Sequence, residues 1–311
     1  MKLNFTLFLI SFCLFFSLTS QAQQDPQYTQ FMFNNLVLNP AVAGSKESIS
    51  IFALTRYQWV GITDAPETQT ISVHKPFESI SSGIGFHIIN DKLGASSSLS
   101  FMADYAYKYE LPNGTLSGGV SLGMIQNTLD GSKLNPGEPL DPKIPVSMEN
   151  SIGLDAGLGL YYNAENFYVG LSTTHINASR IKLATPTSET DSRLARHIYL
   201  TGGYIYPLSA NVEIRPSVLI KVQNQAQFEL NTNVFLRQKY WEGVSYRSSD
   251  AISALIGLNI TESIRLGYSY DINVSGLSAY NNGSHEITLG YDLFVLPRIK
   301  SDIIIKTPRF L

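Results

Sequence analysis

The sequence predicts an all-β protein, a transmembrane antiparallel β-barrel of the bacterial outer membrane with about 14 strands. Three observations favour this fold class. Apolar and polar residues alternate in many short segments, and short connections between these segments alternate with long ones. Charged residues make up only 15% of the 311-residue chain, whereas a typical soluble domain has roughly 25%.

The stretch "RLGYSYDIN", residues 265–273, illustrates the alternation. Successive side chains of a strand point to opposite faces, so Tyr268 and Tyr270 share one face while Arg265 and Asp271 share the other. Buried charges need water or an opposite charge, and a polar lumen supplies both. We therefore expect the apolar faces to meet lipid and the charged faces to line the lumen. The candidate lumen charges are Glu213, Arg215, Lys221, Glu229, Arg237, Arg265, Asp271, Glu286 and Asp292.

The alternating segments give the expected strand positions. Beyond residue 22 there is no apolar run of the roughly 18 residues that a membrane helix needs, so a membrane-spanning form must be a closed barrel. A soluble double-sheet sandwich can also alternate and stays open as the alternative. Strands are expected at residues 48–56, 67–76, 82–90, 97–109, 115–127, 150–162, 166–176, 195–206, 211–222, 226–237, 240–247, 251–260, 263–273 and 284–295.

The N-terminal residues 1–22 predict a secretory signal peptide. Lys2 precedes an apolar run, and the small residue Ala22 marks the expected cleavage site. Cys13, the only cysteine, lies within this run. The exported chain is therefore expected to have no disulfide and no cysteine nucleophile.

Three further regions follow the signal peptide. Residues 23–47 predict a periplasmic lead-in or plug, because Pro40 and Gly44 interrupt regular structure and the apolar residues around them favour burial. The barrel is expected over residues 48–296. Residues 297–311 predict a periplasmic C-terminal tail, which packs on the lead-in, docks a partner or adds one more strand.

The sequence gives no sign of a catalytic or metal site. The five histidines are scattered one to a strand or strand end, and none has the spacing of a metal motif. We expect no enzyme activity, no cofactor and no bound metal. The net charge of −3 offers no basic face, so nucleic acid is not an expected partner.

The stretch "RYQWVGITDAP" falls in the expected first long loop. Its aromatic residues are typical of the belt at a membrane boundary, but exposed Trp and Arg are also favoured anchors of interfaces. Together with two residues of the lead-in, this loop supplies the candidate partner contacts. These are Asn39, Pro40, Arg56, Trp59, Gly61 and Pro66.

Several segments together resemble the PorP/SprF family of the type IX secretion system. They include "QQDPQYTQFMFNNLVLNPAVAGS", "RYQWVGITDAPETQTISVHKPF", "WEGVSYRSSDAISALIGLNI", "RLGYSYDINVSGL" and "GSHEITLGYDL", spread over nearly all of the exported chain. The resemblance implies an outer-membrane barrel of Bacteroidota that serves protein secretion and gliding motility. The partners it implies are the type IX translocon, periplasmic ring or peptidoglycan-binding components, and cargo with a C-terminal sorting domain.

The resulting hypothesis is a barrel that docks partners on both sides of the outer membrane. Long loops at residues 56–66, 128–149, 177–194 and 274–283 form the candidate cargo face, and residues 23–47 and 296–311 form the candidate periplasmic face. The alternative is a passive outer-membrane channel or hydrophobic-solute transporter. A soluble exported β protein and an outer-membrane enzyme rank below these.

Overall fold

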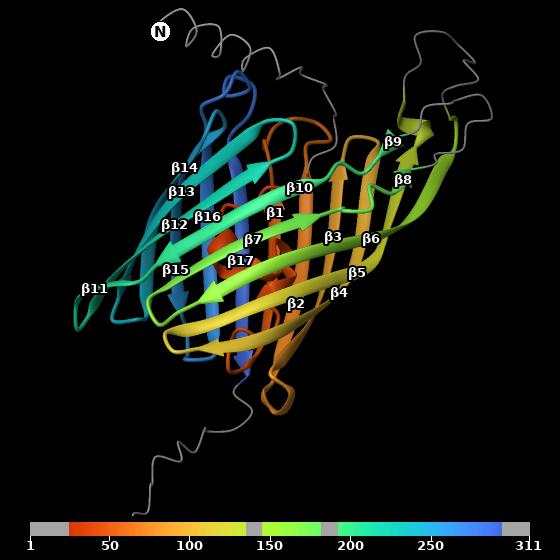
Figure 1. Ribbon diagram of the computed structural model, residues 1–311. Coiled ribbons are helices and arrows are strands. Elements are labelled where there is room, and N and C mark those ends of the chain that lie inside the picture. Colours follow the sequence, from red (N-terminus) through yellow and green to blue (C-terminus); the bar gives the residue numbers. More distant parts are fainter. Residues whose placement is uncertain (1–24, 135–144, 182–191, 294–311) are drawn as a thin grey trace, which may run out of the picture.

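The computed structural model describes residues 25–134, 145–181 and 192–293, and it shows a closed antiparallel β-barrel (Figure 1). Neighbouring barrel strands pair in chain order from β1 through β7, β10 and β12 to β17, and β17 pairs with β1 to close the barrel. Two short strands form a separate pair, and β11 extends the wall beside β12. The expected all-β barrel of about 14 strands is confirmed, and closure excludes the two-sheet sandwich.

The strands agree with the expected positions to within a few residues. The barrel strands are β1 (Ile49–Tyr57), β2 (Glu67–Phe77), β3 (Ser82–Leu93), β4 (Ser96–Leu111), β5 (Gly114–Asp130), β6 (Met148–Asn163), β7 (Phe167–Thr174), β10 (His197–Tyr204), β12 (Val212–Val222), β13 (Ala226–Leu236), β14 (Tyr240–Arg247), β15 (Ala251–Asn259), β16 (Ile264–Asn273) and β17 (Ser284–Leu293). The short strands are β8 (Arg180–Ile181), β9 (Ser192–Arg193) and β11 (Tyr206–Ser209).

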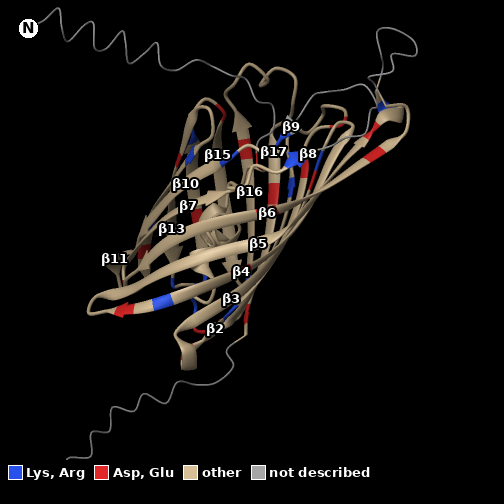
Figure 2. Ribbon diagram, turned by 45° about the vertical axis from the view of Figure 1, so that its right-hand side comes forward, with Lys and Arg blue, Asp and Glu red and all other residues tan. Residues whose placement is uncertain are grey.

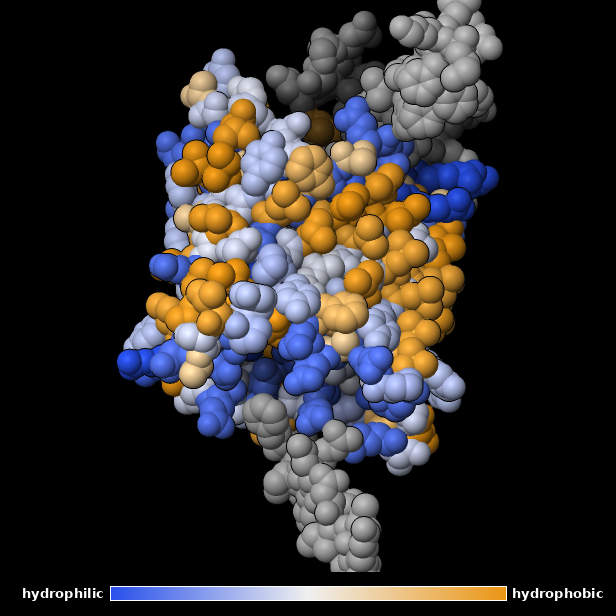
Figure 3. Space-filling model, turned by 60° about the vertical axis from the view of Figure 1, so that its left-hand side comes forward, coloured by the Kyte–Doolittle hydropathy of each residue, from blue (hydrophilic) through white to orange (hydrophobic). Residues whose placement is uncertain are grey.

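Strand length and alternation explain why this sequence closes into a barrel. Side chains of β17 alternate between buried Glu286 and Thr288 and exposed Ile287 and Leu289. On the face shown in Figure 3, hydrophobic residues gather across the middle of the barrel, and hydrophilic residues are more frequent toward its ends. Charged residues lie mostly toward the strand ends (Figure 2). Among the described residues, no helix has the length and apolar character to cross a membrane.

The two ends of the barrel differ. The four longest connections, 58–66, 131–147, 175–196 and 274–283, all follow strands that end on the same side, which we call the loop end. The opposite side, where short connections such as 112–113 and 164–166 lie, is the turn end. The long connections therefore gather at one end of the barrel, because every second connection of an antiparallel barrel lies on the same side. This arrangement matches the loop asymmetry expected from the sequence.

Residues 25–45, here called the lumen segment, lie inside the barrel (Figure 1). They form three single-turn 3₁₀ helices, η1 (Phe31–Phe33), η2 (Asn35–Val37) and η3 (Pro40–Val42). The segment begins beside His175 and His197 at the loop end, and its Gly44 lies beside His74 and Lys108 at the turn end. The chain therefore passes through the lumen before β1 begins. Two further 3₁₀ turns, η4 (Glu78–Ile80) and η5 (Gly131–Lys133), lie in connections.

The motif "NPAV" builds the last turn of the lumen segment. Asn39 caps η3 by accepting a hydrogen bond from the Ala41 amide at 2.9 Å, and Pro40 occupies the first helical position, where its missing N–H is no loss. The Asn39 amide group donates to the backbone oxygen of Leu160 at 2.9 Å. The cap thus fixes both the turn and its place on β6.

Small residues on the barrel wall make room for this turn. A Cβ atom added to Gly119 would overlap the backbone of Ala41, and one added to Gly159 would overlap the Asn39 side chain. Gly83 is equally close to Ala43. Gly83, Gly119 and Gly159 therefore leave the space that the last turn of the lumen segment occupies.

Candidate functional site

Two buried arginines and three buried carboxylates hold the start of the lumen segment. Arg56 Nη2 lies 2.7 Å from Asp271 Oδ2, and its Nη1 lies 3.3 Å from Glu286 Oε2. Arg247 Nε lies 2.8 Å from Glu229 Oε2, and its Nη1 lies 3.3 Å from Asp271 Oδ2. We call this set, with Thr29, the lumen latch. All five charged side chains are at most 4% exposed, so each charge depends on its partners rather than on water.

Thr29 is the residue of the lumen segment whose side chain binds the charged residues of the latch. Its hydroxyl accepts hydrogen bonds from Arg56 Nη1 and Arg247 Nη2, both at 2.9 Å, and donates one to Asp271 at 2.9 Å. One donor and two acceptor lone pairs are the full capacity of a hydroxyl group. The side chain is therefore completely satisfied while being fully buried.

Glu286 binds the backbone of the same turn. Its two carboxylate oxygens accept from the amides of Thr29 and Gln30 at 2.9 and 2.8 Å. The Gln30 side chain accepts from the hydroxyl of Thr288 at 2.9 Å. Charged acceptors strengthen such bonds, so β17 holds this turn of the lumen segment through both its main chain and its side chains.

Aromatic contacts hold the next turn. Phe33 lies 4.8 Å from Trp241 and 6.5 Å from Phe235, measured between ring centroids. The guanidinium of Arg215 lies 3.9 Å from the centroid of the Phe235 ring. The lumen is thus partly apolar around Phe33, although the alternation in the sequence predicted that the inner face of the strands is polar.

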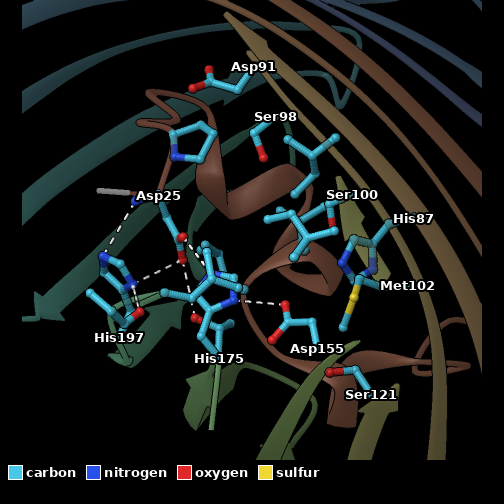
Figure 4. Close-up of a pocket in the computed structure, with 18 of the residues that line it drawn as sticks. Asp25, His87, Asp91, Ser98, Ser100, Met102, Ser121, Asp155, His175 and His197 are labelled. Carbon is cyan, nitrogen blue, oxygen red and sulfur yellow. Dashed lines mark hydrogen bonds and ion pairs between the residues drawn. The ribbon is translucent and has the colours of Figure 1, made fainter. Parts of the chain in front are cut away.

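A second anchor lies at the loop end, around Asp25. Its carboxylate contacts Nε2 of His175 at 2.8 Å, accepts a hydrogen bond from the Tyr199 hydroxyl at 2.6 Å, and lies 3.4 Å from Nδ1 of His197 (Figure 4). The His197 Nδ1 atom is also 3.1 Å from the backbone oxygen of Ala195. The ammonium of Lys221 donates to the backbone oxygen of Asp25 at 2.8 Å.

The pKa values at this anchor favour an ion pair. Burial alone raises the pKa of Asp25, but the facing His175 and His197 hold that pKa well below its usual value. Burial alone lowers the pKa of His175, but Asp25 and Asp155 raise it to about 10. Near neutral pH, Asp25 is therefore ionised and His175 is protonated.

The first and last long loops join to form an exposed surface at the loop end. The amide of Val60 donates to Gly283 at 2.8 Å, and the amide of Asn282 donates back to Val60 at 2.7 Å. Tyr280, 74% exposed, projects from the same pair of loops. We call residues 58–66 and 274–283 the loop-end patch.

The structure separates the candidate partner contacts into two groups. Trp59, Gly61 and Pro66 belong to the loop-end patch, where Gly61 is exposed and the other two are half-buried. Asn39, Pro40 and Arg56 are buried inside the barrel. This corrects the expectation for those three, because the lumen segment and the latch use them and leave no surface for a partner.

The candidate lumen charges lie on the inner face with one exception. Lys221, Glu229, Asp271 and Glu286 are buried, while Glu213, Arg215, Arg265 and Asp292 are half-buried and lie close to opposite charges. Arg237 is exposed in the turn between β13 and β14, which corrects its assignment to the lumen. The physical reason is that β13 ends at Leu236, so the alternation no longer applies.

Sequence reasoning missed Asp25, Thr29 and Arg247 as site residues. Asp25 and Thr29 precede the first strand and have no pattern that marks them. Arg247 lies at the end of β14, and a charged residue in that position is typical of a strand end exposed to solvent. The partners of Asp25 and Thr29 are distant along the chain, so only the closed barrel brings them together, whereas Arg247 meets Glu229 directly across the β13–β14 hairpin.

A cavity of about 460 Å³ lies between the lumen segment and the inner wall. Its apolar lining includes Leu36 and Val37 of the segment together with Ile89, Met102 and Ile125 of the wall. His87, paired with Asp104 at 2.9 Å, also borders it. The segment therefore leaves part of the lumen near the loop end unfilled by the described residues.

A closed barrel of antiparallel strands, with an apolar outer band and a polar lumen, is the architecture of bacterial outer-membrane proteins, and this chain is an outer-membrane β-barrel. Residues 20–291 match the family described as type IX secretion system membrane protein PorP/SprF. The chain belongs to this family, as its motifs predicted, and is a secretion-related barrel. No curated protein matches the chain.

Solved structures with a similar fold are outer-membrane proteins of other bacteria. The toluene transporter TbuX of Ralstonia pickettii is 10% identical, with a TM-score of 0.50 over 83% of this chain and 92% of that chain. The toluene transporter TodX of Pseudomonas putida is 8% identical, with a TM-score of 0.50 over 87% and 95%. Omp33 of Acinetobacter baumannii is 11% identical, with a TM-score of 0.47 over 79% and 99%. At these identities the similarity to the two toluene transporters shows the fold alone.

Proposed function

We propose that this protein is a docking component of the type IX secretion and gliding machinery. Its loop end binds a secreted cargo protein through the cargo's C-terminal sorting domain. Its turn end binds the machinery, namely the translocon and periplasmic ring or peptidoglycan-binding components. The mechanism is binding alone, with no bond made or broken.

The observation that carries this proposal is the occupied lumen. The lumen segment crosses the barrel from the loop end to the turn end and is held there by the lumen latch. A barrel that carries a solute needs a clear path, whereas a docking barrel needs a rigid body that presents its two ends. The latch supplies rigidity, because opening it would leave buried charges without partners.

The loop-end patch supports a cargo face. Tyr280 combines a large apolar ring with a hydroxyl and is 74% exposed, while Val274 and Leu277 nearby are also exposed. Exposed aromatic residues of this kind are favoured anchors of interfaces. Two backbone hydrogen bonds between the loops fix the patch, so a partner meets a surface that is already ordered.

The test is an affinity pull-down of the tagged full chain from detergent-solubilised outer membranes, with bound proteins identified by mass spectrometry. We expect recovery of a large exported protein that carries a sorting domain, together with machinery components. Tyr280→Ser should reduce cargo recovery about tenfold, the effect of one anchor worth about 1.4 kcal/mol.

Ile80→Ser is the matched control, because Ile80 is a 60% exposed apolar residue at the turn end. It should leave cargo recovery unchanged. Heat-modifiable migration in electrophoresis checks that each variant is folded. A folded barrel that repeatedly comes down alone under mild detergent contradicts the docking function.

The cavity favours one second candidate, a passive channel or hydrophobic-solute transporter. Its partly apolar lining near the loop end suits a small apolar solute. This function predicts ion conductance in planar bilayers or solute uptake into vesicles that contain the purified barrel. A barrel that shows neither ion conductance nor solute uptake would eliminate the channel or transporter function.

A further inference from the structure

A set of metal-ligating side chains lies at the loop end, apart from the latch. Asp25, His175 and His197 each offer one ligand atom, and these atoms all lie within 4.8 Å of one another. Figure 4 shows the two imidazole rings and the carboxylate converging from the lumen segment and the barrel wall. Two imidazoles and one carboxylate form a ligand set that zinc uses in proteins, with a fourth position open.

The distances suit a single small cation. Nε2 of His175 lies 2.8 Å from one oxygen of Asp25, and Nδ1 of His197 lies 3.4 Å from the other. Zinc bonds nitrogen and oxygen at roughly 2.0–2.2 Å, so neighbouring ligand atoms in a tetrahedral site are about 3.3 Å apart. Metal binding requires His175 to lose the proton that it shares with Asp25, and Nδ1 of His197 to give up its contact with the backbone oxygen of Ala195. Small side-chain movements then bring the three groups around one ion.

A supporting contact orients one of the imidazoles. Asp155 Oδ2 lies 2.7 Å from Nδ1 of His175, which leaves Nε2 facing Asp25. A carboxylate behind a histidine is the usual arrangement around protein-bound zinc, because it fixes the ring and increases its basicity. The Tyr199 hydroxyl fixes Asp25 in the same way, at 2.6 Å.

Nearby charge is close to balanced. The ammonium of Lys221, 2.8 Å from the backbone oxygen of Asp25, opposes a second positive charge, and the carboxylate of Asp155 offsets it. All three ligand residues also line the cavity, so water has access to a fourth position. Oxygen-preferring cations such as Mg²⁺ and Ca²⁺ fit poorly, because two of the three ligands are nitrogens.

We propose that Asp25, His175 and His197 bind a zinc ion or a similar transition-metal dication, with water as the fourth ligand. Metal binding here does not depend on the proposed docking function, because it uses only the positions of these three side chains. His175 and His197 stand at the two sides of the connection between β7 and β10, and Asp25 stands at the start of the lumen segment. The ion therefore ties the segment to one of the candidate cargo loops.

Sequence spacing could not reveal this site and predicted no metal. Asp25 and His175 are 150 residues apart, and the two histidines are separated by a long connection. No short motif contains them. The barrel alone brings them together, as it does the latch.

The test is isothermal titration of zinc chloride into the full chain, purified in detergent and first treated with a chelator. The titration runs at about pH 8 in two buffers of different ionisation enthalpy, because zinc must displace the proton of His175 and the released proton is then measured along with binding. We expect one zinc ion per chain. His175→Asn and His197→Asn should weaken binding by at least about 100-fold, and Asp155→Asn by roughly 10- to 100-fold.

His87→Asn is the matched control, because His87 is a buried histidine paired with Asp104 beside the same cavity and has no third ligand among the residues that the structure describes. It should bind zinc as the unmodified chain does. Cobalt chloride added to the unmodified chain gives a second readout, the visible absorption of tetrahedral cobalt, which needs no variant to fold. Absence of both zinc binding and this absorption, or equal affinity in His197→Asn and His87→Asn, overturns the site.

Discussion

Thr29→Val removes one hydroxyl from the lumen latch and keeps the shape of the side chain. The hydroxyl accepts from Arg56 and Arg247 and donates to Asp271, each at 2.9 Å. Valine can make none of these bonds. The two guanidinium groups and the carboxylate then remain buried with one partner fewer.

The expected cost follows from these contacts. A hydrogen bond to a charged group contributes about 1.5–3 kcal/mol. The three bonds share one hydroxyl, and Arg56 and Asp271 keep each other as partners at 2.7 Å, so their contributions do not add in full. We expect the segment to be held about 2–3 kcal/mol less tightly, which raises the population of its released form roughly 30- to 150-fold.

The assay uses the absence of cysteine from the expected exported chain, since Cys13 is the only one in the sequence. Val42→Cys places a thiol on the buried lumen segment, where it reacts with a maleimide only when the segment is released. The labelling rate therefore measures release. In this background, Thr29→Val should raise the rate by the factor given above.

Thr201→Val is the control for this experiment. Thr201 is a buried threonine of β10 whose hydroxyl has no hydrogen-bond partner within the described part of the chain. Its replacement should leave the labelling rate unchanged. Equal rates for Thr29→Val and Thr201→Val would refute the latch as the element that holds the segment.

Three further predictions concern the latch, the glycines and the lipid face. Arg56→Met should lower the free energy of unfolding by about 3–5 kcal/mol, because Asp271 and Glu286 lose a buried partner. Urea unfolding in detergent measures this, and a shift no larger than that of the exposed control Arg237→Met contradicts it. Gly119→Val should displace the lumen segment and increase maleimide labelling in the Val42→Cys background, because its side chain would overlap Ala41. The neighbouring residue Gly118 faces outward, so Gly118→Val should not increase maleimide labelling. Equal labelling of the two variants would contradict this packing. Leu289→Lys puts a charge on the lipid face in the middle of β17 and should destabilise the inserted barrel by about 2 kcal/mol or more. Folding yield into lipid vesicles checks this, with loop variant Leu277→Lys as the neutral comparison.

The strands could be predicted from the sequence because each carries its own signal. Alternation in "RLGYSYDIN" assigns Asp271 to the lumen and Tyr268 to the outer face without knowledge of any other strand. The barrel class follows from low charge and sorted loops. The alternation is local to each strand, the charge content and loop sorting are properties of the whole chain, and the structure confirms the barrel that they predict.

The candidate site could not be predicted in the same way, because its contacts are long-range. The alternation in β13 and β14 does not show that Phe235 and Trp241 face Phe33 inside the lumen. The motif containing Asn39 and Pro40 was a candidate for partner binding, yet its partner is the barrel's own wall. A buried motif and an exposed binding motif look alike in one sequence, since both join apolar and polar residues.

The contacts of Glu286 also have a consequence for biogenesis. Its carboxylate binds the amides of Thr29 and Gln30, which lie 257 and 256 residues earlier in the chain. The lumen segment therefore gains this partner only after β17 has been synthesised and delivered to the growing wall, and β17 also pairs with β1 to close the seam. Seam closure and this contact of the lumen segment therefore both depend on β17. The earliest part of the exported chain to be synthesised is thus among the last to reach its final position.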